Sequence, residues 1–158
     1  MKIPVRVQRF LDKTKAEYEL IEHRTVYTAY DKAATLKVQE KVVGKTLALK
    51  IDSSYCLVLI PANKNLDKNK FRKVAKTKKV DFVKEAWMKK NLKGMKIGAV
   101  PPLGALFKMN AFVDAGLLRN PKIIIGSGVY TVSIKITPGV LKKIMPDLVV
   151  GNFSAAKK

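Results

Sequence analysis

The chain is poor in the residues from which many active sites and covalent cross-links are built. Among 158 residues there is one cysteine, Cys56, and one histidine, His23. A single cysteine cannot form an internal disulfide, and one Cys with one His cannot provide the ligand spacing of a zinc site. A Ser-His-Asp or Cys-His catalytic arrangement is not convincing, because His23 is the sole imidazole and its simplest role is structural. We therefore expect neither a metal nor another cofactor.

Long hydrophobic segments are also missing. No apolar run approaches the roughly 20 residues of a membrane span. The first residues, Met1–Arg6, lack the apolar region of a signal peptide. We therefore expect no membrane partner and a cytoplasmic location, where a lone free thiol stays reduced. Cys56 lies in the apolar run Tyr55–Ile60, which predicts that the thiol is buried.

Acidic residues are scarce: 12 Asp and Glu stand against 32 Lys and Arg, a formal net charge of +20. Hydrophobic residues make up 47% of the chain, which excludes wholesale disorder, and 158 residues suit one domain. The charge therefore lies on a folded body and favours a polyanionic partner such as nucleic acid. Only 5 of the 32 are arginine, and lysine suits sequence-independent attraction to backbone phosphates. The alternative is a lysine coat that serves solubility.

Half of the excess charge lies in one fifth of the chain. Residues 64–96 contain 13 Lys or Arg and three acidic residues, a net charge of +10. Apolar spacing predicts two helices in this segment, at 67–78 and 84–92, each with one buried side. We therefore expect their lysines, among them Lys70, Lys73, Lys89 and Lys90, to form one basic patch.

The remaining pattern predicts an α+β domain around a mostly antiparallel sheet. Thr28 is the expected N-cap of a helix to about Val38, with Asp31 three residues on. The other predicted helices are 4–15 and 138–144, and the predicted strands are 18–23, 42–51, 55–61, 111–113, 122–125, 130–136 and 148–150. We place the single domain at 1–154 and a basic tail at 155–158.

Lys45 breaks the pattern of its own strand. With a period of two, Val43, Leu47, Leu49 and Ile51 share its face. An ammonium group pointed toward a core is costly unless it is paired or lies in a cleft, and such groups concentrate in functional sites. The alternative is that Lys45, near the start of the strand, extends to water.

Two glycine-containing segments are further candidates. In Gly98-Ala99-Val100-Pro101-Pro102-Leu103-Gly104, glycine allows close approach of the backbone and the prolines stiffen the loop. Such a loop can aim N–H groups at a carbonyl oxygen or a phosphate. The prolines have no N–H, so the donors must be Gly98, Ala99, Val100, Leu103 or Gly104. The alternatives are a structural crossover here and a plain hairpin turn at Gly126-Ser127-Gly128.

These segments resemble the YbaK family, the aminoacyl-tRNA editing domains related to the insertion domain of bacterial prolyl-tRNA synthetases. The resemblance spans about residues 18–145. Four stretches carry it in family order: His23-Arg24-Thr25-Val26-Tyr27-Thr28 with Asp31-Lys32-Ala33-Ala34, Gly44-Lys45-Thr46-Leu47 with Ile60-Pro61-Ala62, Gly98–Gly104 with Phe112-Val113-Asp114, and Ile125-Gly126-Ser127-Gly128. The resemblance implies a partly barrel-like fold and hydrolysis of the ester that joins a wrong amino acid to tRNA. It makes misacylated tRNA the expected partner and a synthetase a further candidate.

The resemblance also assigns roles. Lys45 matches a pocket lysine that would hold the terminal adenosine or its phosphate, or orient the ester. With Gly98, Ala99 and Gly104 it forms the expected catalytic set. The expected substrate-binding residues are Thr28, Thr46, Val100, Pro101, Pro102, Leu103, Asp114, Gly126, Ser127 and Gly128. For Asp114, a helix N-cap is the alternative. The basic patch would bind tRNA.

Two departures from the family concern the specificity pocket. Leu103 stands where many members have Phe, and no His lies near Gly126–Gly128. The sequence therefore does not indicate which amino acid would be removed. Two other functions stay open: a non-catalytic module of this fold that binds tRNA, and a relative that acts on a small aminoacyl compound or binds a protein.

Overall fold

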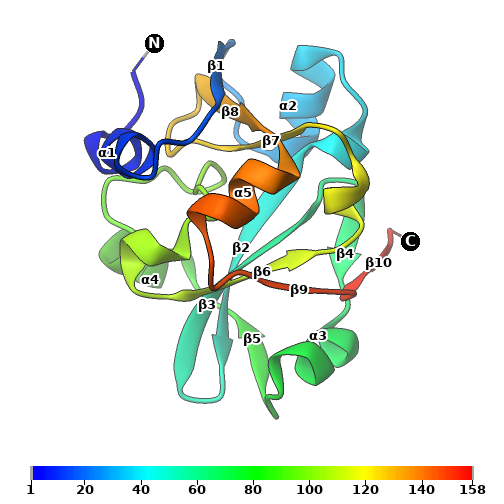
Figure 1. Cartoon of the computed structure of the whole chain (residues 1–158). Helices are drawn as coiled ribbons and strands as arrows, with labels where there is room; N and C mark the ends of the chain where they lie inside the picture. The colour runs from blue at the N-terminus through cyan, green and yellow to red at the C-terminus, as the bar shows by residue number, and fades with distance from the viewer. Residues whose placement is uncertain (1, 158) are drawn as a thin grey trace.

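The computed structural model describes residues 2–157 and is shown in Figure 1. The helices are α1 (Val5–Lys13), α2 (Ala29–Leu36), α3 (Lys68–Ala75), α4 (Glu85–Asn91) and α5 (Pro138–Ile144). Short 3-10 helices are η1 (Glu40–Val42), η2 (Gly104–Phe107) and η3 (Leu117–Arg119). The strands are β1 (Glu19–Glu22), β2 (Gly44–Ile51), β3 (Ser54–Pro61), β4 (Lys64–Leu66), β5 (Val80–Phe82), β6 (Asn110–Asp114), β7 (Ile123–Gly126), β8 (Val132–Ile136), β9 (Val149–Gly151) and β10 (Ser154–Ala156). None of these helices is long enough to cross a membrane.

The strands form three sheets. The largest has the order β5-β2-β3-β6-β9, a second has the order β1-β8-β7, and β10 pairs with β4. Only β6 pairs in parallel, with β3 and with β9, and every other pair is antiparallel. A parallel bridge between Val43 and Ile124 joins the first two sheets. The expected mixed, mostly antiparallel α+β domain is therefore confirmed.

Side-chain caps fix the helix starts that the sequence predicts. The hydroxyl of Thr28 accepts a hydrogen bond from the Asp31 N–H at 3.0 Å, and the carboxylate of Asp67 accepts one from Lys70 N–H at 3.0 Å. Such caps satisfy N–H groups that have no partner within the helix. Pro4 differs from the prediction: its ψ of 139° is extended, so α1 begins after it, at Val5.

Several boundaries also differ from the sequence prediction. Glu40–Val42 forms a 3-10 turn, so β2 starts at Gly44, two residues later than expected. Three short strands, β4, β5 and β10, were not predicted, because segments of three residues carry too little periodicity. β10 includes Ala155 and Ala156, so the ordered structure continues into the segment that we assigned to a tail.

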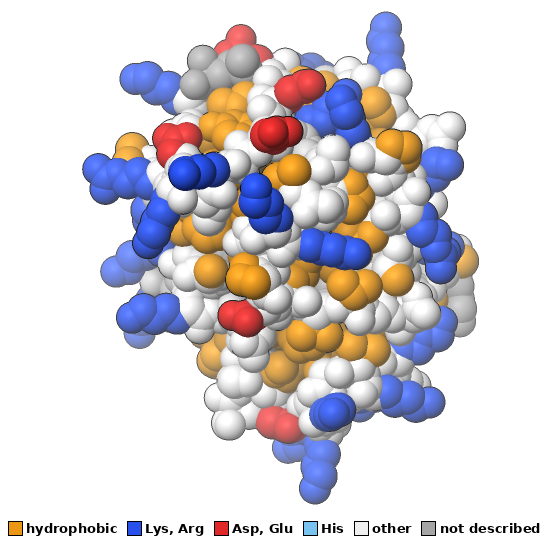
Figure 2. Space-filling model, viewed as in Figure 1, with side chains coloured by type: hydrophobic (Ala, Val, Ile, Leu, Met, Phe, Trp, Pro, Cys, Tyr) orange, Lys and Arg blue, Asp and Glu red, His pale blue; other side chains and the backbone are white. Residues whose placement is uncertain are grey.

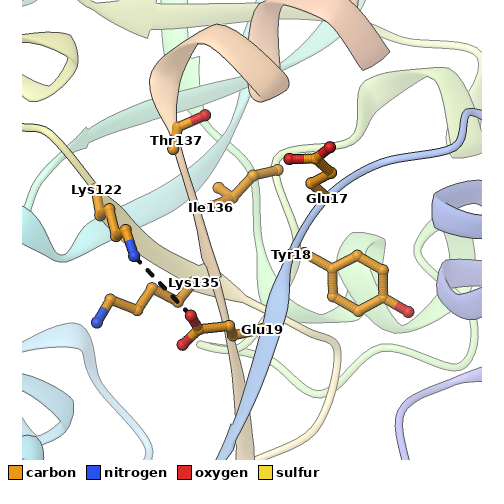
Figure 3. A pocket seen from close by; sticks show the side chains of 7 residues that line it. All are labelled: Glu17, Tyr18, Glu19, Lys122, Lys135, Ile136 and Thr137. Atoms are coloured by element: carbon orange, nitrogen blue, oxygen red, sulfur yellow. Dashed lines mark ion pairs between the residues drawn. The ribbon is translucent and has the colours of Figure 1, made fainter.

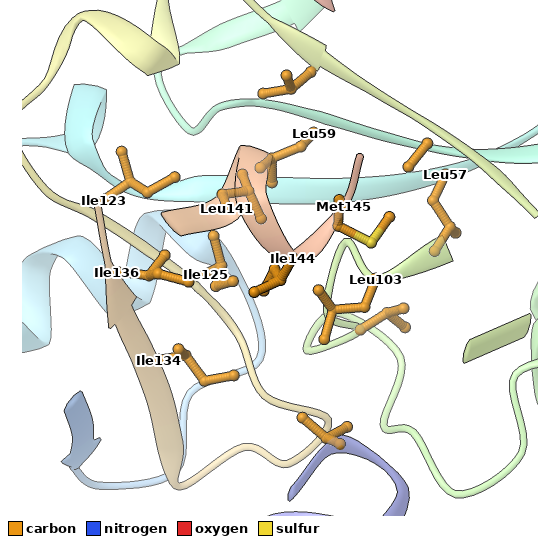
Figure 4. Packing of buried hydrophobic residues seen from close by; sticks show 14 of the residues in the cluster. Leu57, Leu59, Leu103, Ile123, Ile125, Ile134, Ile136, Leu141, Ile144 and Met145 are labelled. Carbon is orange, nitrogen blue, oxygen red and sulfur yellow. The ribbon is translucent and has the colours of Figure 1, made fainter. Parts of the chain in front are cut away.

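The two sides of β3 pack into separate cores because its side chains alternate. Leu57 and Leu59 join the larger core with α5 and the strands β7 and β8 (Figure 4). Cys56, Val58 and Ile60 join a second core, which also contains Phe71 of α3. Cys56 is buried as expected, and burial raises the pKa of its thiol to about 12.

This alternation places the two basic helices on opposite faces of the five-stranded sheet. α3 packs through Phe71 against the second core, whereas Trp87 and Met88 of α4 pack against the larger one. Lys70 and Lys73 therefore lie over one face, and Lys89 and Lys90 over the other. The expected single patch is wrong in this respect, because sequence periodicity identifies a buried side but not the face of the sheet that it covers.

Candidate active site

One edge of β2 is interrupted, and the candidate site lies at this interruption. Beyond the bridge at Val43, β2 has no paired strand on the side away from β3 until Leu49 meets β5, within residues 2–157. Ala62 N–H donates to the Val43 carbonyl, on the β3 side, and Val83 N–H donates to the Ala48 carbonyl, on the other. Backbone groups alternate sides along a strand, so those of Thr46 face the gap.

The loop from Gly98 approaches this gap and is held by close backbone contacts. Gly98 has φ of +90°, and a Cβ there would lie 2.2 Å from the Tyr27 carbonyl oxygen. Only glycine fits this position. The Ala99 carbonyl accepts a hydrogen bond from Gly128 N–H at 2.7 Å, and a Cβ on Gly126 would lie 2.6 Å from the same oxygen. The two glycine-containing segments that the sequence singles out therefore meet in space.

A cavity of about 210 Å³, which we call the edge cavity, lies between β2 and this loop. Its lining is mostly apolar: Thr46, Leu47, Ala48, Leu57, Phe82, Val83, Met88, Leu92, Ile97, Gly98 and Val100. The Thr46 hydroxyl is buried and has no hydrogen-bond partner among the described residues. A buried polar group without a partner costs free energy, which a ligand at this position would recover.

The loop also offers free backbone donors. Two of the five candidate N–H groups are used internally, since Ala99 N–H donates to Lys96 O and Gly104 N–H to Pro102 O. The N–H groups of Gly98, Val100 and Leu103 have no protein partner within residues 2–157. Gly98 and Val100 line the edge cavity, whereas Leu103 is fully buried in the larger core. Gly98 and Val100 are therefore the available donors beside Thr46.

Lys45 does not line the edge cavity, and its side chain lies on the face of β2 opposite to that of Thr46. Its side chain is half-buried, and Thr46, one residue on, lines the cavity instead. Burial lowers the pKa of Lys45, the nearby Lys157 lowers it further, and Glu40 opposes both. Lys45 therefore flanks the interrupted edge of β2 from the face that also carries the C-terminal strand.

Four loop residues that we expected in the site, three as substrate contacts and Gly104 in the catalytic set, are buried. Pro101 and Pro102 are buried, and so is Gly104, where a Cβ would lie 2.4 Å from the Met109 carbonyl oxygen. Leu103 fills the larger core and does not line the edge cavity. The replacement of Phe by Leu at position 103 therefore changes core packing in this structure.

Three polar residues of the expected set have their polar groups engaged within the protein. The Ser127 hydroxyl donates to the Val132 carbonyl, and the Thr28 hydroxyl caps α2. The buried Asp114 carboxylate accepts hydrogen bonds from the N–H groups of Gly116, Phe153 and Ser154 and from the Ser154 hydroxyl, at 2.9–3.1 Å. Asp114 is therefore neither the N-cap of a helix nor free to bind a ligand; it anchors the C-terminal segment.

His23 has a structural position. Its Nδ1 lies 2.8 Å from the Arg24 carbonyl oxygen and its Nε2 lies 2.8 Å from Ser133 Oγ. A carbonyl can only accept, so Nδ1 carries a proton, and in the neutral ring Nε2 accepts from the hydroxyl. No group of three or more potential metal-ligating side chains is present among residues 2–157.

A second buried lysine, Lys32, was not singled out by the sequence. It lies on the inner side of α2 beside Ala33, is 5% exposed, and has no hydrogen bond or ion pair within residues 2–157. A single lysine within an eight-residue helix carries no signal of its own in the sequence. Burial lowers the pKa of Lys32 to about 8.

Lys32 is expected to make stability depend on alkaline pH. Its pKa is 10.5 when unfolded and about 8 when folded, so between these values the unfolded chain binds more protons. The free energy of unfolding should therefore rise with pH across this window, by up to about 3 kcal/mol. Urea unfolding of the protein and of Lys32→Met between pH 7 and 10.5 measures this; equal slopes in both proteins would contradict it.

A second concave site lies over the paired strands β1 and β8 and the start of β7 (Figure 3). It is lined by Glu17, Tyr18, Glu19, Lys122, Lys135, Ile136 and Thr137. Its one ion pair joins Lys122 and Glu19 at 3.9 Å, and both side chains are more than half exposed. Exposed pairs of this kind contribute little. No polar side chain that lines this groove is buried, whereas the edge cavity contains the buried Thr46 hydroxyl. The edge cavity is therefore the stronger candidate for the active site.

Comparison with known proteins identifies relatives of the whole domain. The sequence profile of the aminoacyl-tRNA editing domain matches residues 23–144. No curated protein matches the chain. The crystal structure of a hypothetical protein superposes with a TM-score of 0.85 at 23% identity, covering 95% of this chain and 99% of the other.

Two further structures show how widely the fold is used. A protein described as a proposed trans-editing enzyme for prolyl tRNA synthetase has a TM-score of 0.83 at 21% identity, with 96% of each chain covered. A proposed signal transduction protein from Marinobacter aquaeolei VT8 has a TM-score of 0.76 at 14% identity, covering 98% of this chain and 31% of the other. The fold therefore occurs in different settings, and an activity must be argued from the site.

Proposed function

The chain belongs to the aminoacyl-tRNA editing domain family, and we propose that it is a hydrolase that removes a wrong amino acid from tRNA. The observation that carries this proposal is the edge cavity. Its apolar wall would receive the side chain of the amino acid, while the unpaired N–H groups of Gly98 and Val100 border the same space. These N–H groups would donate hydrogen bonds to the carbonyl oxygen of the ester and stabilise the negative charge that develops on it.

The reaction needs few protein side chains, because an aminoacyl ester is already activated. A positioned water adds to the ester carbonyl carbon, and the carbonyl oxygen becomes an oxyanion held by Gly98 and Val100 N–H. The bond to the ribose oxygen then breaks, and that oxygen takes up the proton that the water releases. The neighbouring ribose hydroxyl can relay this proton. Positioning and oxyanion donors thus replace a catalytic triad.

Thr46 and Lys45 would hold the substrate from the two faces of β2. The buried Thr46 hydroxyl, which lacks a partner, would bond the ester or the ribose inside the cavity. Lys45 would hold the terminal adenosine or its phosphate at the interrupted edge. The amino acid itself stays open, since one methylene in an apolar pocket discriminates by only about 1–3 kcal/mol.

The test is a deacylation screen with tRNAs that carry wrong small amino acids. We expect catalysed release of at least one of them, with the correctly charged tRNA spared. If the protein binds these tRNAs with strong salt dependence but releases no amino acid, it is a binding module and the hydrolase proposal is wrong. If it binds no tRNA even at low salt, the partner is a different molecule.

A further inference from the structure

A second and larger hollow lies on the face of the sheet that α3 covers. Its volume is about 660 Å³. It is formed where η1, β4, α3, η3 and the segment before β10 converge, and we call it the basic hollow. Its lining is polar almost throughout: Lys41, Pro61, Asn63, Lys64, Lys70, Asp114, Gly116, Arg119, Asn120, Asn152 and Ser154.

Four cationic side chains around the basic hollow lack an acidic partner. Lys41, Lys64, Lys70 and Arg119 form no ion pair within residues 2–157. The one carboxylate in the wall, Asp114, is occupied by hydrogen bonds from Gly116, Phe153 and Ser154. A concave surface with several cations and one shielded anion has a positive potential that attracts anions.

The walls of the basic hollow are fixed by hydrogen bonds. The Asn120 amide donates to the Lys41 carbonyl at 3.0 Å and to the Leu117 carbonyl at 2.9 Å, which ties η1 to η3. Asp114 ties the end of β6 to Ser154 in β10. A site with pre-set walls needs less reorganisation when a ligand binds.

The basic hollow and Lys45 lie at the same end of the β2–β3 pair. Pro61, which lines the hollow, pairs with Gly44, and Lys45 pairs with Ile60. Lys64, also in the lining, pairs with Ala156, so the adjacent Lys157 lies near both sites. The Coulomb effect of Lys157 on Lys45 reflects this proximity. Positive charge therefore continues from the hollow to Lys45.

We propose that the basic hollow binds backbone phosphates of the tRNA acceptor stem while the 3′ end enters the edge cavity. The inference rests on the proposed function for the identity of the RNA. Lys64, Lys70 and Arg119 supply the contacts, and lysine suits phosphates that are met without reading the bases. In Figure 2, Lys and Arg side chains lie around the whole outline of the molecule, so the hollow is set apart by its concave shape rather than by charge alone.

The test compares Lys64→Glu/Arg119→Glu with the matched double reversal Lys142→Glu/Lys143→Glu. The latter changes the same charge on exposed positions of α5. Binding of uncharged tRNA is measured at several salt concentrations. We expect the first variant to bind about 10- to 100-fold more weakly and its salt slope to fall by about two, with the control close to the parent protein.

Three results would overturn the inference. They are equal losses in both variants, an unchanged slope in the first, or an equal loss on reversal of Lys89 and Lys90 on the opposite face. A nucleoside monophosphate or inorganic phosphate can be titrated in the same way. If it binds saturably and tRNA binds no more tightly than it does, the hollow is a site for a small ligand instead. Because this readout is binding, it is independent of whether any misacylated tRNA is hydrolysed. Circular dichroism of each variant establishes that it is folded.

Discussion

Replacement of Lys45 by alanine is expected to reduce deacylation of the misacylated tRNA by about 100-fold or more, with the fold intact. Lys45 lies in the interrupted part of β2, next to Thr46, which lines the edge cavity. Its ammonium group would therefore contact the 3′ end beside this cavity. Removal of a half-buried charge that lies near Lys157 relieves repulsion, so we expect stability to be unchanged or slightly higher. Single-turnover hydrolysis and urea unfolding measure the two effects.

Lys50→Ala is the matched control for this experiment. Lys50 lies in the same strand but is exposed on the opposite face, where its Nζ lies 5.8 Å from the centre of the Tyr55 ring. This variant removes the same charge from β2 and should retain activity. Full activity of Lys45→Ala, or equal loss in both variants, would show that Lys45 has no specific role in hydrolysis.

Substitution of Gly126 by alanine is expected to lower activity about 100-fold through displacement of the donor loop. An added Cβ would lie 2.6 Å from the Ala99 carbonyl oxygen and 2.7 Å from the Val100 carbonyl oxygen. Both partners are backbone atoms, so the loop must shift, and a misplacement of about 1 Å in a catalytic geometry can cost this much. The shift moves the N–H groups of Gly98 and Val100 relative to the ester.

Gly139→Ala provides the comparison, because nothing lies within 4 Å of a Cβ at Gly139. It adds the same methyl group in α5 and should leave kcat near the parent value. For Gly126→Ala, a loss in kcat with tRNA affinity retained would support displacement of the donors. Unchanged kcat together with reduced thermal stability would instead restrict the role of Gly126 to packing.

Local signals predicted most of the regular structure. The caps at Thr28 and Asp67, Pro138 at the start of α5, and the alternation around Ile134 all depend on neighbours within a few residues. The parallel pairs that β6 makes with β3 and β9 join segments far apart in the chain. No short-range pattern encodes such a pairing. For the same reason, the sequence did not predict that α3 and α4 lie on opposite faces of the five-stranded sheet.

The sequence predicted the glycines of the candidate site better than the side chains that line it. Gly98 and Gly126 indicate a close approach of the backbone because glycine has no side chain, and the structure brings their two segments together. Lys45 was recognised as anomalous and Thr46 was placed among the expected substrate-binding residues, and of these two residues only Thr46 lines the edge cavity. Leu103 and Asp114 look like site residues in sequence because apolar and acidic side chains serve cores and pockets equally well.

The hydrogen bonds of Asp114 have a consequence for how the protein folds. Its carboxylate is buried at the end of β6, yet three of its four donors, the N–H groups of Phe153 and Ser154 and the Ser154 hydroxyl, lie 39 or 40 residues later. On the ribosome, this charge stays without its main partners until those residues emerge. An uncompensated buried charge is strongly destabilising, so the sheet can close only late in synthesis. Ribosome-bound chains that stop before Phe153 should therefore remain sensitive to protease even when most of the core sequence has been made.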